Sequence, residues 1–157
     1  MSKRINNSFE RGVATIEFAI TASFFFLMLV AVVSGGHFYW THNALVEATR
    51  RGARYGANQC FPDQSGCPDS NTTIARVKNV VLYNSSTAGA SPIVPSLQAS
   101  NVIVTYSTNP AYGIASGTVS VKIQNYQYRF MGVNITMPPY ETTVQGENAG
   151  WIPATIP

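Results

Sequence analysis

The sequence predicts an α+β protein with one long amino-terminal helix, a short second helix and a small antiparallel sheet of about three or four strands. Three observations predict this class. Residues Val13–Val33 are almost entirely apolar and lead into a proline-free stretch, Thr41–Asn58. A short segment with helical periodicity comes next. The rest of the chain contains β-branched runs in which polar and apolar residues alternate.

The apolar segment has the length of a membrane span. As a helix, Val13–Val33 would extend about 31 Å, which is close to the hydrocarbon thickness of a bilayer. Side chains that suit a membrane interface come shortly afterwards: His37, Phe38, Tyr39 and Trp40. We therefore expect a helix over residues 13–58 whose transmembrane part, in contact with membrane lipid, covers about residues 13–36.

Basic residues flank the apolar segment on both sides. Lys3, Arg4 and Arg11 lie in a polar leader, residues 1–12, and Arg50, Arg51 and Arg54 lie beyond the segment. The number of basic residues is therefore equal on the two flanks, and the positive-inside rule alone does not decide the orientation. Arg11 lies close to the apolar segment whereas Arg50 is well removed from it, and this favours a cytoplasmic leader with the carboxyl-terminal part outside the cytoplasm.

The composition argues against a nucleic-acid partner. The 157 residues carry 10 basic and 7 acidic groups, but three of the basic groups and Glu10 belong to the leader. The rest of the chain is nearly neutral, whereas phosphate binding needs a clustered basic face. A charged fraction of only 11%, with abundant serine, threonine, asparagine and glutamine, suits an exported surface protein.

Two cysteines, Cys60 and Cys67, flank a short loop after the predicted long helix. A disulfide formed in an oxidising compartment is the favoured interpretation, and it agrees with an external domain. Free thiols and a metal site are the alternatives, but zinc takes four ligands and no histidine is near either cysteine. We expect neither a metal nor a cofactor.

Small residues recur every four positions in the second part of the predicted helix, at Ala44, Ala48, Gly52 and Gly56. This spacing places them in a row along one helical face, where another backbone can approach closely. The alternative is that the two glycines only weaken and end the helix, at about 1 kcal/mol each relative to alanine. We favour close packing, with a partner that the sequence does not identify.

Residues 59–157 are expected to form one external globular domain. Ile74, Val77 and Val81 share one stripe of a short helix that Ser70 or Asn71 would cap. Residues 84–100 are expected to be a connection. Strands are predicted at Val102–Tyr106, at Thr118–Gln124 continuing toward Tyr126–Phe130, and at Tyr140–Val144.

The most informative residues lie where the apolar segment begins. The charged leader ends at Gly12, and Glu17 and Phe18 follow inside the apolar run. A carboxylate in the middle of a membrane helix costs about 2.5 to 3.5 kcal/mol, and less near an end, so Glu17 requires an explanation. Cleavage after Gly12 would create an α-amino group on Val13, about 6 Å along the helix from Glu17, with which the carboxylate could pair in the same or a neighbouring subunit.

This segment resembles the processing site of type IV pilin-like precursors, and specifically that of the TadE-like pseudopilins of the tight-adherence (Flp) pilus. In that family a glycine ends a basic leader, and glutamate and an aromatic residue stand at the fifth and sixth positions of the mature chain. Gly12, Glu17 and Phe18 match this pattern. Asn43–Gly56 is similar to the family's alanine- and arginine-containing motif at the end of the long helix.

The resemblance implies cleavage between Gly12 and Val13 by a prepilin peptidase at the bacterial inner membrane. It also implies incorporation at low copy into an adhesive pilus, with other pilin subunits and the inner-membrane assembly platform as partners. Glu17 and Phe18 would then act in assembly. The short major Flp pilin lacks a globular domain of this size, which argues for a minor subunit.

Two other interpretations stay open from the residues alone. The apolar segment could be an uncleaved membrane anchor, or a secretory signal peptide cut near residues 33–36, although Glu17 inside it counts against a signal peptide. An enzyme is not expected, because no serine, histidine and acid can be placed together. His37 and His42 are expected near the membrane interface instead.

Overall fold

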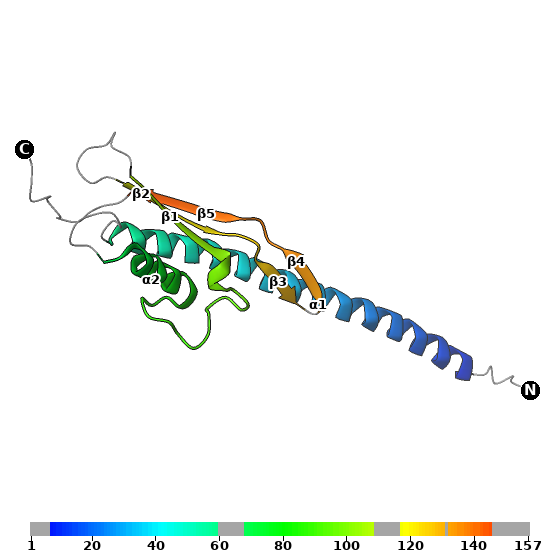
Figure 1. Ribbon diagram of the computed structural model, residues 1–157. Coiled ribbons are helices and arrows are strands. Elements are labelled where there is room, and N and C mark those ends of the chain that lie inside the picture. Colours follow the sequence, from blue (N-terminus) through cyan, green and yellow to red (C-terminus); the bar gives the residue numbers. More distant parts are fainter. Residues whose placement is uncertain (1–6, 60–67, 109–116, 131, 146–157) are drawn as a thin grey trace, which may run out of the picture. The chain divides into compact units, whose positions relative to one another are not determined.

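The structure is a computed structural model that describes residues 7–59, 68–108, 117–130 and 132–145 (Figure 1). The chain divides into two compact units, Met1–Tyr39 and Trp40–Pro157. The first helix contributes to both units, so the second unit contains helical residues that the sequence analysis grouped with the membrane helix. The α+β class is confirmed, with a long apolar helix, a short helix, a three-stranded antiparallel sheet and a two-stranded sheet.

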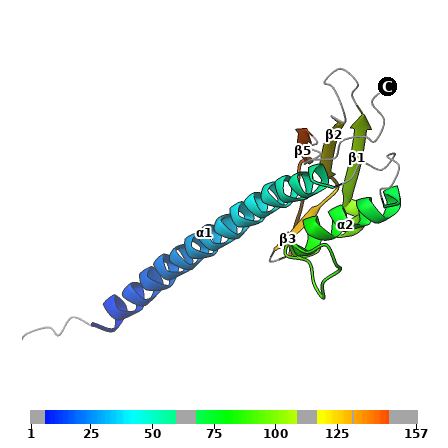
Figure 2. The same ribbon diagram turned by 90° about the vertical axis from the view of Figure 1, so that its left-hand side faces the viewer.

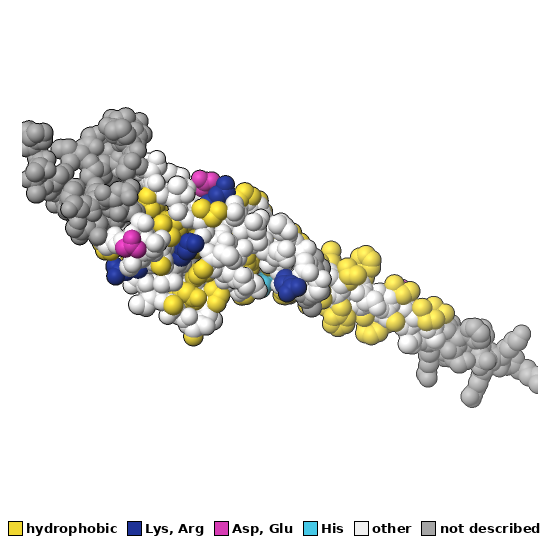
Figure 3. All heavy atoms as spheres, viewed as in Figure 1, with side chains coloured by type: hydrophobic (Ala, Val, Ile, Leu, Met, Phe, Trp, Pro, Cys, Tyr) yellow, Lys and Arg dark blue, Asp and Glu magenta, His cyan; other side chains and the backbone are white. Residues whose placement is uncertain are grey.

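Helix α1 extends from Asn7 to Ala57 and therefore begins inside the predicted leader. In the first unit its side chains are exposed, from Val13, 61% exposed, to Tyr39, 66% exposed. Figure 3 shows apolar side chains over the face of this unit that it views. Two serines in this unit donate hydrogen bonds from their hydroxyl groups to carbonyl groups of the preceding helical turn. Ser23 Oγ donates to the Ala19 carbonyl at 2.8 Å, and Ser34 Oγ donates to the Val30 carbonyl at 2.7 Å. Such bonds satisfy polar side chains where lipid offers no partner.

The main sheet of the second unit has the strand order β1-β2-β5, with both pairs antiparallel. These strands are β1, Val102–Thr108, β2, Gly117–Ile123, and β5, Tyr140–Gln145. Alternate residues of β2 are fully buried, as the period-two pattern predicts: Val119, Val121 and Ile123 are each 0% exposed. The other face is polar, and there Lys122 Nζ lies 3.4 Å from Glu141 Oε2.

Strands β3, Gln127–Phe130, and β4, Val133–Thr136, form a separate two-stranded sheet. The sequence analysis treated β3 as a continuation of β2 and did not predict β4. Asn125 has a φ of 55°, a left-handed conformation that asparagine tolerates better than most residues, and it interrupts the strand. The chain therefore changes direction between β2 and β3 and starts a new hairpin.

Helix α2, Ser70–Tyr83, contributes Val77, Val80, Val81 and Leu82 to the interior. Its cap position is Asp69, not the predicted Ser70 or Asn71, and the Asp69 side chain makes no capping hydrogen bond. The helix ends at Asn84, which has a left-handed φ of 56° and whose N–H donates to the Val80 carbonyl. A single 3-10 turn, η1, Ala99–Asn101, leads into β1.

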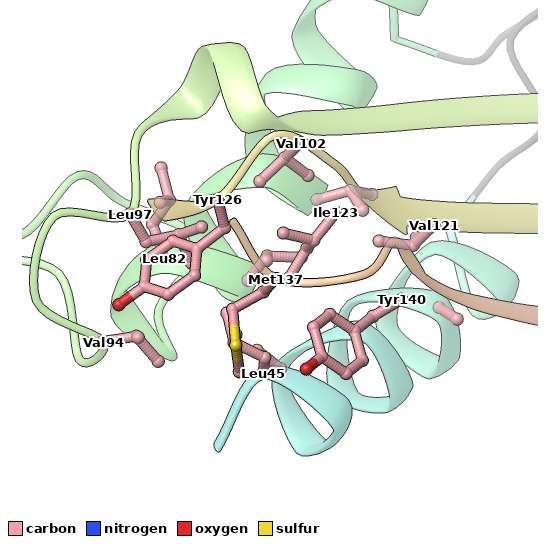
Figure 4. Close-up of a cluster of buried hydrophobic side chains, with 14 of the residues drawn as sticks. Leu45, Leu82, Val94, Leu97, Val102, Val121, Ile123, Tyr126, Met137 and Tyr140 are labelled. Carbon is pink, nitrogen blue, oxygen red and sulfur yellow. The ribbon is translucent and has the colours of Figure 1, made fainter. Parts of the chain in front are cut away.

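The core of the second unit lies between the sheet and the two helices, which both cover the same face of the sheet (Figures 1 and 2). Leu45 of α1 packs there with Ile123, Met137 and Tyr140 (Figure 4). The predicted connection over residues 84–100 is irregular, yet Val94 and Leu97 are 1% and 3% exposed within this core. This connection therefore contributes apolar contacts as well as joining α2 to the sheet.

Candidate processing and assembly site

The Gly12–Val13 peptide lies within the described part of α1 and is exposed. A Cβ atom placed on Gly12 would have no atom within 4 Å, so the surroundings leave room for another protein. A peptidase would need an extended backbone, so cleavage at this peptide would require the helix to unwind locally. Glycine lowers the helical stability at this position by about 1 kcal/mol relative to alanine, which favours that opening.

Glu17 and Phe18 lie on the exposed surface of the same helix, and Phe18 is 74% exposed. No salt bridge to Glu17 occurs within the residues that the structure describes. From Val13 to Val46 the sequence contains no other aspartate or glutamate and no lysine or arginine. In a membrane, a carboxylate at this position is costly unless a cation pairs with it.

An apolar surface surrounds this carboxylate. Helix α1 contains a window long and apolar enough to cross a membrane, with a mean hydropathy of 2.4 and none of it buried. A signal sequence near the amino terminus would pass the same test. One face of the first unit has a shallow depression lined by Ile16, Ala19, Ile20, Ser23, Phe24 and Leu27. Its side chains suit a lipid chain or another apolar helix.

The row of small residues lies in the second unit, against neighbours from the same chain. Ala44 is half-buried, and Ala48, Gly52 and Gly56 are buried. A Cβ atom on Gly52 would overlap the Val81 side chain of α2. A Cβ atom on Gly56 would lie 2.9 Å from Val119 Cγ1 of β2. The partner that the sequence left unidentified at these glycines is therefore the chain's own domain, and the two glycines let α2 and β2 approach α1 closely.

Sequence reasoning missed two hydrogen bonds that connect α1 to β5. His42 Nδ1 lies 2.8 Å from the Tyr140 hydroxyl, and the two rings meet edge to face at 5.2 Å. Thr49 Oγ1 donates to the Val46 carbonyl and lies 3.0 Å from Thr142 Oγ1, which is therefore the donor of that second bond. His42 thus belongs to the folded domain. The partners are more than ninety residues apart in the sequence, and no local pattern indicates them.

Ionisation is suppressed at Tyr106 and Tyr140 of the second unit. Burial, and then the neighbouring Tyr55, raises the pKa of Tyr106 to about 12, and burial also raises the pKa of Tyr140. Within the described residues, no group of three His, Cys, Asp or Glu side chains could hold a metal ion. Cys60 and Cys67 lie outside the described residues, so the predicted disulfide stays a prediction.

Comparison with known families bears on the amino-terminal part of the chain. The family model described as TadE-like protein matches residues 12–54. This segment is similar to the TadE-like family. No curated protein and no solved structure gives a significant match.

The TadE-like segment includes Gly12, Glu17, Phe18 and the row from Ala44 to Gly52, and the resemblance noted in the sequence is confirmed over it. The helix that is long and apolar enough to cross a membrane lies in part within the matched segment.

Proposed function

We propose that this chain is a minor pilin-like subunit of a tight-adherence pilus, cleaved after Gly12 by a prepilin peptidase and then assembled through its apolar helix. It is inserted in the inner membrane with the second unit outside the cytoplasm, and contributes to pilus assembly and surface adhesion. The observation that carries this proposal is an exposed apolar helix with one carboxylate five residues after Gly12, inside a segment matched by the TadE-like family.

The carboxylate of Glu17 provides a physical reason for cleavage before assembly, because cleavage creates a cation with which it can pair. Before cleavage, the nearest lysine or arginine in the sequence is Arg11, six residues before Glu17, and an unpaired carboxylate is costly in lipid. After cleavage, the Val13 α-amino group supplies a cation one helical turn away, and on docking a neighbouring subunit can supply the same group. Removing one partner of such a low-dielectric pair typically costs about 3 to 5 kcal/mol. The pair would therefore favour processed subunits over precursors during assembly.

The mature amino terminus tests the cleavage. Mass spectrometry of the protein from membranes should show a chain that begins at Val13. Gly12→Leu should accumulate a membrane-bound precursor heavier by about 1.3 kDa, the approximate mass of a twelve-residue leader. A chain that begins near Gly36 would support a secretory signal peptide instead, and an intact amino terminus in the wild type would support an uncleaved anchor.

The role of Glu17 is tested by Glu17→Leu, with Thr21→Leu as the matched control. Thr21 is also an exposed polar residue and lies one helical turn further along. Both variants should insert in the membrane, but only Glu17→Leu should lose crosslinks to other pilus subunits at matched expression. Equal crosslinking and equal piliation for Glu17→Leu and wild type would contradict an assembly role for this carboxylate.

We also propose that Cys60 and Cys67 form a disulfide outside the cytoplasm, because the two cysteines close a short loop in an envelope protein. Closing such a loop restricts the unfolded chain and would stabilise the fold by about 2.5 kcal/mol before strain. Thiol labelling of protein purified without reductant should modify neither cysteine, and should modify both after reduction. Labelling of both cysteines without reductant would contradict the disulfide and remove one support for the external orientation.

A further inference from the structure

The β3–β4 hairpin and Trp40 lie at the same end of the second unit. At the base of the hairpin, the Met137 N–H donates to the Tyr126 carbonyl at 2.9 Å, and Met137 lies beside Leu45 in the core (Figure 4). Figures 1 and 2 place the hairpin at the end of the unit where α1 enters it. Trp40, the first residue of this unit, is 50% exposed.

The hairpin is long enough to reach the level of Trp40. Each of its strands has four residues and extends about 13 Å. Leu45 and Trp40 are separated by about 7.5 Å along the helix axis. A hairpin that starts beside Leu45 and follows the helix toward residue 40 therefore covers the whole of this distance.

The register of the hairpin gives it two different faces. Tyr128 pairs with Ile135, and Arg129 pairs with Asn134, so apolar and polar residues are on opposite faces. Tyr128 is buried in the core, but its cross-strand neighbour Ile135 is 43% exposed. The exposed end of the unit therefore presents two large apolar side chains, Trp40 and Ile135.

The charge of the hairpin is positive. Arg129 is exposed, and its Nε donates to Asn134 Oδ1 at 3.0 Å, which orients the guanidinium on the polar face. Residues 127–136 contain no aspartate or glutamate. An exposed apolar side chain and an exposed guanidinium on the two faces of one hairpin match the chemistry of a phospholipid headgroup layer that the hairpin enters edge-on, and tryptophan and arginine are favoured in such a layer.

We propose that the β3–β4 hairpin rests on the bilayer surface, with Ile135 and Trp40 in the headgroup layer and Arg129 on lipid phosphate. This proposal rests on the membrane insertion of α1 contained in the proposed function. The argument for lipid as the occupant is continuity, because Trp40 follows the apolar segment directly in the chain. The contact would hold the domain against the bilayer before the subunit is extracted into a pilus.

Photocrosslinking of the full-length chain in nanodiscs of phosphatidylethanolamine and phosphatidylglycerol tests the contact. A benzophenone side chain replaces Ile135 in one sample. Matched controls carry it at Ile93 or Ile103, which are 42% and 38% exposed in the same unit, and a positive control carries it at Phe26 in the apolar helix. Intact-mass spectrometry should detect lipid adducts at Phe26 and at Ile135, the latter at least about fivefold above both matched controls. Arg129→Gln should lower the share of phosphatidylglycerol among the Ile135 adducts by about fivefold, the factor expected for one basic residue at an anionic surface.

The outcomes separate this inference from the proposed function. Lipid adducts at Phe26, with Ile135 no different from Ile93 and Ile103, would overturn the hairpin contact and leave membrane insertion intact. Adducts between Ile135 and a second protein chain would overturn it in favour of a subunit interface. Absence of lipid adducts at Phe26 would overturn both. An unchanged lipid distribution in Arg129→Gln would overturn the phosphate contact assigned to that residue.

Discussion

The two parts of helix α1 place apolar residues in opposite environments. Up to Tyr39, leucine, valine and phenylalanine side chains are exposed, as at Leu27, which is 68% exposed. After Trp40, the face of the helix that carries Leu45 is buried against the rest of the second unit, and Leu45 is 0% exposed. The first part is therefore suited to an environment that other molecules supply, and the second part to one that the chain builds for itself.

This difference predicts which substitutions disturb the fold and which disturb association. A buried side chain in the second unit contributes to the stability of the isolated chain, whereas an exposed one in the first unit contributes only when lipid or another subunit covers it. Paired substitutions, one in each part of the helix, can therefore test this difference.

The largest effect is expected for Leu45→Ala. Removing this fully buried side chain should lower the free energy of unfolding of the second unit by about 2 to 5 kcal/mol. The matched change Leu27→Ala should leave that value within about 0.5 kcal/mol of wild type. Urea unfolding of the detergent-solubilised chain, followed by near-ultraviolet circular dichroism, measures both. Equal effects of the two substitutions would show that the two parts of the helix do not differ in this way.

Replacing glycine by alanine should have opposite effects on stability in the two parts of the helix. In Gly56→Ala the new Cβ would lie 2.9 Å from Val119 Cγ1 and 3.2 Å from the Tyr106 hydroxyl, so crowding of about 1 to 3 kcal/mol should outweigh the gain in helix propensity. In Gly36→Ala no atom lies within 4 Å, and the helix should gain up to about 1 kcal/mol. Hydrogen exchange of amides near each position reports the change. Slower exchange around Gly56 in its alanine variant would contradict the close packing.

Alkaline pH should destabilise the second unit. Unfolded tyrosine ionises near pH 10, whereas the folded state keeps the Tyr106 proton up to a pKa of about 12. The stabilisation is therefore fully present below about pH 10 and is lost as the pH rises through about 12, because the unfolded chain releases its proton first. Urea midpoints at pH 8 and pH 11 should show this fall, and Tyr106→Phe should reduce it. An identical pH dependence in the variant would exclude Tyr106 as its source.

A smaller effect is expected for Tyr140→Phe, which removes the hydroxyl 2.8 Å from His42 Nδ1 but keeps the edge-to-face ring contact. Loss of one part-buried hydrogen bond should cost about 0.5 to 1.5 kcal/mol. Tyr39→Phe is the matched control, because Tyr39 is 66% exposed in the first unit. Thermal unfolding should separate the two variants, and a stability of Tyr140→Phe equal to wild type would show that this bond is energetically neutral.

Local pattern was sufficient to predict the features whose physical cause is local. The apolar segment, the helical stripe of Val77 and Val81, and the alternation along β2 each follow from the period of one element, and the structure contains all three. The family resemblance was also local, since it depends on Gly12, Glu17 and nearby residues.

Features that depend on distant contacts could not be predicted in this way. The break at Asn125 depends on a left-handed backbone that the sequence permits without requiring it. Burial of Val94 and Leu97 arises because an irregular connection crosses the core, and His42 meets a tyrosine that is distant in the sequence. The roles of Gly12, Glu17 and the two cysteines stay predictions, because their partners are other molecules or residues outside the described structure.

The contacts between α1 and β5 have a consequence for biosynthesis. His42 and Tyr140 are 98 residues apart, so at typical translation rates Tyr140 leaves the ribosome about 5 to 20 s after His42. During this interval the inner side of the helix around Leu45 has no β5 to cover it, while the apolar segment before it has already emerged. Membrane insertion can therefore begin before the domain can fold, and a chain that terminates ahead of β5 would present the uncovered helix surface to chaperones and proteases at the membrane.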